Sequence, residues 1–178
     1  MENNQSIFET ICRLREEEPG LPYRFQDERT AGQKDVLYVL ASEGIPFWRK
    51  EDLAKECCGI LKDLVNKEDT ILTDPVLRHF LEHYPICSYF IELRERVRIT
   101  LEAETSSRER LFHLGMRLAR SGTDPEQVKL GIILLGFFPY DTTKQIMRVL
   151  GYHSEYTLYV LESIQYVFPM QNNFIFEL

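Results

Sequence analysis

The most informative segment of the chain is Asp124-Pro-Glu-Gln-Val-Lys-Leu-Gly-Ile-Ile-Leu-Leu-Gly-Phe-Phe138. Its first two residues are a helix start signal, because an Asp side chain accepts hydrogen bonds from free amide groups and proline is tolerated at the first helical position. From Leu130 onward no side chain of the segment is polar. A helix without a polar face must be covered on several sides. We therefore expect a central helix over about 124–137, flanked by the helices before and after it.

Similar start signals divide the rest of the chain. Ser6 and Ser106 each begin a capping box, in which a Ser and a Glu three residues later bind each other's backbone amide groups. Asp74-Pro75 repeats the Asp-Pro start, and Asp141 and Ser154 are further capping residues. The expected helices cover about 6–18, 33–43, 50–66, 75–84, 86–104, 106–120, 124–137, 141–151 and 154–167, with 46–48 as an apolar connector.

Patterns typical of strands are short and few: only Thr70–Thr73 and Asn173–Glu177 alternate. The chain has 178 residues, of which 44% are hydrophobic, so one domain can bury a core without disulfides. We predict a single all-α domain over residues 1–178, built from eight or nine antiparallel helices.

The charge balance argues against two classes of partner. The net charge is 21 − 28 = −7. An acidic chain is repelled by nucleic acids and anionic membranes, which attract clustered Lys and Arg. The longest apolar run, residues 130–138, is less than half of the roughly twenty residues that a transmembrane helix needs. We expect no membrane partner and do not expect nucleic acid.

The cysteines and the N-terminus favour a cytoplasmic location. The four cysteines form no C-x-x-C pair and are Cys12, Cys57, Cys58 and Cys87. The N-terminal residues lack the basic and apolar regions of a signal peptide. The phosphate-loop, dinucleotide and serine-nucleophile motifs are also missing, so we predict no cofactor and no catalytic residues.

The helix starts in the second half recur at regular distances. They fall at Ser106, Asp124, Asp141 and Ser154, and alternate starts are 141 − 106 = 35 and 154 − 124 = 30 residues apart. Spacings of this size are typical of two-helix repeats. The prediction is repeat stacking that is clearest from 106 to 167, with an irregular helical bundle as the alternative.

Two stretches carry a resemblance to a known type of protein. They are Asp124-Pro-Glu-Gln-Val-Lys-Leu-Gly-Ile-Ile-Leu-Leu135 and Val149-Leu-Gly-Tyr-His-Ser-Glu-Tyr-Thr-Leu-Tyr159. Over about 124–167 the chain resembles the HEAT and armadillo-type helical repeats of bacterial proteins. The resemblance implies HEAT-like stacking or a right-handed α–α superhelix, a surface that binds other macromolecules, and no catalytic residues.

One short motif indicates possible metal chemistry. His79-Phe-Leu-Glu-His83 has the H-x-x-E-H pattern, which places two imidazoles on one helix face for Zn²⁺ and a Glu beside the metal-bound water. The motif is similar to the signature of the insulinase-type peptidases. That resemblance implies Glu162 as a third zinc ligand, with Glu155 seven residues before it. An incidental surface metal pair and plain solvated histidines are the alternatives.

A basic stripe is the second candidate site. Its members recur at helical spacing on one side of the 106–120 helix and are Arg110, His113, Arg117 and Arg120. The preceding helix adds Arg94, Arg96 and Arg98. Such a patch could bind phosphates or an acidic peptide. The alternative is a solvated face on which the basic groups pair with Glu102, Glu104 and Glu109.

We expect the apolar segment Phe174–Leu178 to pack back on the chain or to support self-association. Taken together, these features predict a non-enzymatic helical-repeat module that binds or scaffolds an unknown protein partner. A zinc-dependent hydrolase that uses His79, Glu82 and His83 is the alternative.

Overall fold

The computed structural model describes residues 5–17, 32, 35, 46–67, 70–103 and 108–167. These residues form eight α-helices, one short 3-10 helix and no strand, which confirms the predicted all-α class. The elements are α1 (Ile7–Glu17), α3 (Phe47–Leu64), α4 (Pro75–His83), η2 (Ile86–Ser88), α5 (Phe90–Ala103), α6 (Arg108–Ser121), α7 (Pro125–Leu135), α8 (Asp141–Gly151) and α9 (Ser154–Val167).

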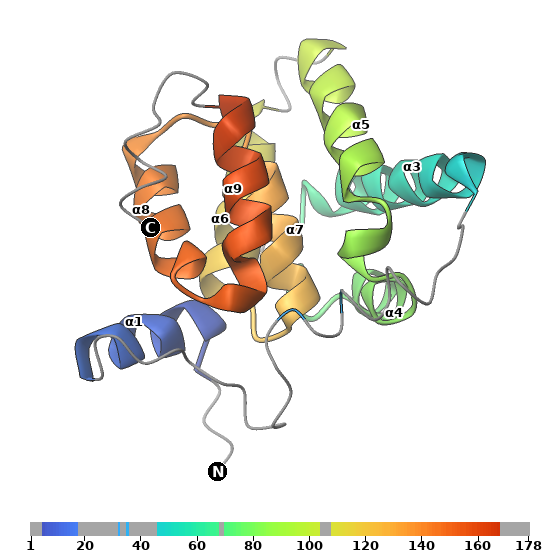
Figure 1. The fold of residues 1–178 in the computed structure, drawn as a ribbon. Coiled ribbons are helices and arrows are strands. Elements are labelled where there is room, and N and C mark those ends of the chain that lie inside the picture. Colours follow the sequence, from blue (N-terminus) through green and yellow to red (C-terminus); the bar gives the residue numbers. More distant parts are fainter. Residues whose placement is uncertain are drawn as a thin grey trace.

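Helix α7 is the centre of the molecule, as its apolar sequence predicts. Every residue from Glu126 to Leu135 is buried. The helix packs against α6 and α9 on one side and against α4, α5 and η2 on the other (Figure 1). One helix therefore joins the α3–α4–α5 group to the α6–α9 group.

The last four α-helices form two antiparallel hairpins. Helix α6 packs against α7, and α8 packs against α9. The hairpins also touch each other, through α6 with α8 and α7 with α9. Helix α1 crosses α6 and α8, and its Ile7 amide donates a 3.0 Å hydrogen bond to the Gly122 carbonyl (Figure 1).

Two of the expected caps form in full. Asp74 Oδ1 accepts hydrogen bonds from the amides of Val76 and Leu77, at 3.0 and 2.9 Å. Asp124 Oδ1 accepts from the amides of Glu126 and Gln127, at 2.9 and 3.2 Å. The capping box of α1 is also present, since Ser6 and Glu9 bind each other's amides at 3.2 Å.

The predictions of two other helix caps are wrong. Asp141 lies inside the first turn of α8, whose N-cap is Tyr140 and has no side-chain cap. Ser154 is the first residue of α9, and His153 Nδ1 accepts the Glu155 amide instead at 3.1 Å. The His153 imidazole nitrogen thus accepts a hydrogen bond at the start of α9, where we expected the Ser154 hydroxyl to be the acceptor.

Two helix boundaries and one strand-like pattern also differ from the prediction. Residues 47 and 48, expected in a connector, are the first turn of α3. The single helix expected over 86–104 is divided by Tyr89 into η2 and α5. Thr70–Thr73 forms a 3-10 residue and turns, with no strand.

Apart from Asp35, the helix expected over 33–43 lies outside the described residues, as do Ser106 with its capping box and the segment Phe174–Leu178. Among the described helices, none combines the length and the apolar character that crossing a membrane requires.

Candidate functional site

Helix α4 is a short, firmly held helix with one exposed face. The Asp74 cap and Pro75 fix its start, and Pro85 prevents its continuation. Its buried face consists of Leu77, Phe80 and Leu81. The opposite face is presented to solvent and carries the exposed residues Val76, His79, Glu82 and His83.

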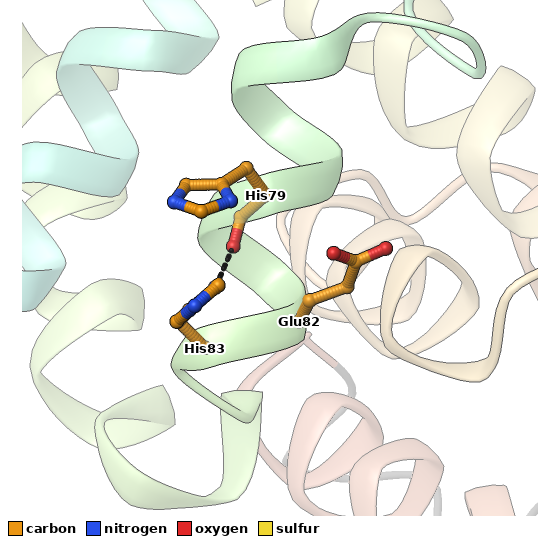
Figure 2. Close-up of side chains that lie close together, drawn as sticks. All are labelled: His79, Glu82 and His83. Carbon is orange, nitrogen blue, oxygen red and sulfur yellow. Dashed lines mark hydrogen bonds between the residues drawn. The ribbon is translucent and has the colours of Figure 1, made fainter.

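The exposed face carries His79, Glu82 and His83 (Figure 2). The two imidazole rings lie on the same side of the helix, with their centroids 4.1 Å apart. One ligand atom from each of the three residues lies within 4.8 Å of the others. The predicted accessibility of the histidines is confirmed, since all three residues are exposed.

His83 is oriented by its own helix. Its Nδ1 lies 2.8 Å from the His79 carbonyl oxygen, as the dashed line in Figure 2 shows. A carbonyl oxygen only accepts hydrogen bonds, so Nδ1 is the donor in this contact. In the neutral ring, Nε2 then keeps its lone pair.

A groove lies between α3 and α4, next to this cluster. Its volume is about 440 Å³, and it is lined by Glu56, Ile60, Pro75, Val76, His79, Phe80 and Tyr84. Val76 is 59% exposed. Arg49 on α3 reaches across to donate to the Tyr84 hydroxyl at 3.2 Å, which ties the two helices together. The groove is thus a mostly apolar hollow between two fixed helices.

Glu162 does not join the histidines. It lies on α9 and pairs with Arg94 of α5, with Arg94 Nη1 at 3.3 Å from Glu162 Oε2. Glu155 is also elsewhere, in a buried cluster described below. The third zinc ligand that the peptidase resemblance implies is therefore engaged with a guanidinium group instead.

The basic stripe faces solvent along α6. Arg110, His113, Arg117 and Arg120 are all exposed. Arg110 donates to Asn66 Oδ1 at 2.6 Å, and the Arg120 guanidinium lies 6.0 Å from the ring centre of Phe8. His113 lies 4.0 Å from Glu109. Its capacity to bind phosphate or an acidic peptide remains a prediction.

The arginines of α5 are paired, as the solvated-face alternative expects. Arg98 binds Glu95 at 2.6 Å and Glu102 at 2.5 Å. Arg96 binds Glu51 of α3 at 3.5 Å. Such exposed pairs contribute about 0–1 kcal/mol each. Glu104 lies outside the described residues.

The core contains a charged cluster that the sequence reading missed. Lys129 is fully buried on α7, and its Nζ binds Asp35 at 2.8 Å, Glu126 at 2.9 Å and Glu155 at 2.7 Å. Tyr159 donates to Asp35 at 2.8 Å. Three carboxylates against one ammonium leave 3 − 1 = 2 excess negative charges when all are ionised.

Burial and mutual repulsion shift the titration of this cluster. Burial raises the pKa of Glu126, although Lys129 and the Ile86 amide act in the opposite direction. Burial alone would lower the pKa of Lys129, but the carboxylates of Glu126, Asp35 and Glu155 outweigh it and raise that pKa. The ammonium therefore stays charged and holds the carboxylates together.

A signal for this cluster was present in the sequence. Lys129 interrupts an apolar run on a helix that must be buried, and a buried ammonium requires partners. Glu126 lies one turn earlier, on the same side. Nothing local indicates Asp35 or Glu155, which tertiary packing brings from distant segments.

The cysteine thiols are shielded rather than activated. Burial raises the pKa of Cys58 to about 11 and, together with Asp35 and Glu126, that of Cys87 to about 12. Burial also raises the pKa of Cys57 and Cys12. A protonated thiol is a poor nucleophile.

No family model matches the chain, and neither a curated protein nor a solved structure matches it. The HEAT-like or armadillo-like type therefore stays a prediction.

Proposed function

We propose that this chain is a non-enzymatic helical module that binds a partner protein in the α3–α4 groove. The groove itself carries the proposal, because it is a mostly apolar hollow of about 440 Å³ with Val76 59% exposed at its edge. Binding sites are typically preformed, concave and mostly apolar, with a few polar groups that fix orientation.

The dimensions and chemistry of the groove favour a particular occupant. Its volume suits one or two bulky apolar side chains, which Phe80, Ile60 and Val76 would contact. Glu56 and the net charge of −7 favour a basic residue close to that apolar anchor. Partner segments of this kind place a few apolar anchors in a groove between helices.

The helical hairpins supply the support for such a module. Two stacked α–α repeats require two helical hairpins whose first helices touch each other and whose second helices touch each other. Here α6 pairs with α7 and α8 pairs with α9, and α6 touches α8 while α7 touches α9. HEAT-like stacking is part of the proposal, as is a cytoplasmic location, in which the four unpaired cysteines would stay reduced.

A random-peptide display library tests the groove without knowledge of the natural partner. We expect selected peptides to share an apolar residue next to Lys or Arg. Val76→Asp should weaken their binding about tenfold or more in calorimetry, because a carboxylate would be buried against the anchor. Ile99→Asp on α5 is the matched control, since Ile99 is also exposed, at 48%, and does not line the groove.

Peptides whose affinity is equal for the wild type and Val76→Asp would overturn the proposal, as would a library from which nothing is enriched. The hydrolase alternative has less support, because Glu162 is bound to Arg94 and no further acidic residue takes its place in the described cluster around His79.

A further inference from the structure

We propose that His79, His83 and Glu82 form a binding site for Zn²⁺ or a similar late first-row divalent ion on the exposed face of α4. The site borders the groove of the proposed function, because His79 belongs to both, but metal binding needs neither a partner protein nor catalysis. Among the described residues, it uses the one exposed group in which two imidazoles and a carboxylate place ligand atoms within 4.8 Å of one another.

The spacing of the donors suits chelation. Residues i, i+3 and i+4 lie next to one another on a helix, and the two imidazole centroids are already 4.1 Å apart. Zinc bonds of about 2.0–2.2 Å place tetrahedral donor atoms about 3.4 Å apart. The ligand atoms of the three exposed residues lie within 4.8 Å of one another, so they are within about 1.4 Å of that spacing.

His83 already has the arrangement of a metal ligand. Its Nδ1 donates to the His79 carbonyl at 2.8 Å, which leaves Nε2 as the donor atom for a metal. Metal-bound histidines commonly donate their other ring N–H to a carbonyl or carboxylate, which fixes the ring and its tautomer. The hydrogen bond therefore prepares His83 before any metal arrives.

The helix that carries the site lowers the entropic cost of bringing the metal ligands into position. Asp74 caps the start of α4, and Leu77, Phe80 and Leu81 anchor its other face. The backbone thus holds both histidines at fixed positions in advance. Two imidazoles and a carboxylate suit Zn²⁺, Ni²⁺ and Cu²⁺ better than Mg²⁺ or Ca²⁺, which prefer oxygen ligands.

Calorimetric titration of the untagged full chain with Zn²⁺ tests the site. We expect one bound ion, and at least tenfold weaker binding in His79→Ala and in His83→Ala. Glu82→Gln should weaken binding severalfold. His113→Ala is the matched control, because His113 is an exposed histidine on α6 and is expected to leave the affinity unchanged. Circular dichroism of each variant verifies that it is folded.

A Zn²⁺ affinity that is unchanged in both histidine variants would place the ion on other groups, such as the cysteines, and would overturn the site. Lack of binding by the wild type would also overturn it. Because the probe is the metal alone, failure of this experiment and failure of the peptide-binding experiment are separate results.

Discussion

Gly131 shows how a single position decides the packing of the central helices. A Cβ atom there would lie 2.4 Å from the Ala119 amide nitrogen and 2.9 Å from its Cα. The backbones of α6 and α7 therefore approach each other directly at this point. On α6, a Cβ at Gly115 would likewise lie 3.0 Å from the Leu134 Cβ.

Gly131→Ala should destabilise the protein, although alanine is normally the better helix former. The methyl group would collide with backbone atoms of α6, and relief of such overpacking costs about 1–3 kcal/mol. Gly59→Ala is the matched control, because Gly59 is an exposed position within α3 with no atom within 4 Å of an added Cβ. That change should stabilise by about 0.4–1 kcal/mol. Urea unfolding of both variants measures the contrast, and a stabilised Gly131→Ala would contradict the close approach.

At the scale of elements, the capping signals differ in how reliably they determine a helix start. The two Asp-Pro pairs, at Asp74 and Asp124, both cap as expected. Asp141 and Ser154 lack the following proline and lie inside their helices. Proline fixes the first helical residue and so determines which residue precedes it. Without it, packing against the core can move the start by one residue.

The Lys129 cluster ties elements together that are distant in the sequence. It joins α7 through Glu126 and Lys129 to α9 through Glu155 and Tyr159, and to Asp35 near the N-terminus. The Ile86 amide of η2 also binds Glu126 at 2.7 Å. The cluster therefore contributes to the positions of these elements relative to the central helix.

Lys129→Met should remove the counter-charge of this cluster and destabilise the protein by roughly 3–5 kcal/mol near pH 7.5. The loss should be smaller at pH 5. Burial raises the pKa of Glu126 and the charge of Lys129 opposes that shift, so removing Lys129 raises this pKa further. A raised pKa in the folded state makes folding more favourable as the pH falls toward and through it, so the variant gains more stability than the wild type between pH 7.5 and pH 5. The other titratable groups that face Lys129 and Glu126 are Asp35, Glu155, Tyr159 and Cys87.

Denaturant unfolding at the two pH values measures the effect. Lys144→Met on α8 is the control, because the Lys144 pair with Asp141 is 3.5 Å long and Asp141 is almost fully exposed. Its effect should stay within about 0.5 kcal/mol at both pH values. An equal loss at pH 5 and pH 7.5 in Lys129→Met would contradict the role of the carboxylates.

At the scale of the whole molecule, α7 should make unfolding cooperative. It contacts α4, α5 and η2 on one side and α6 and α9 on the other, so neither group can unfold without exposing its apolar surface. Trp48 is the single tryptophan of the chain and lies in the first turn of α3, where it is 65% exposed.

Tryptophan fluorescence therefore reports on one group, whereas far-ultraviolet circular dichroism reports on all helices. We expect the two signals to show the same midpoint and slope in guanidinium unfolding, which is the mark of a two-state transition. A fluorescence transition at lower denaturant concentration than the dichroism transition would show that the α3–α4–α5 group unfolds first.

The sequence by itself determined the all-α class, the buried central helix and the exposed histidines of α4. These features follow from spacing along one helix, from Asp-Pro starts such as Asp124, and from runs without a polar residue, all of which are local. Local interactions are the same in any fold that keeps the helix.

Only the tertiary structure decided which distant groups meet. It placed Glu162 with Arg94 rather than with His79, and it brought Asp35 and Glu155 to Lys129. It also formed the groove between α3 and α4. Such contacts depend on the angles and distances between packed helices, which are set by side-chain shape across the whole core and are not encoded in any one segment.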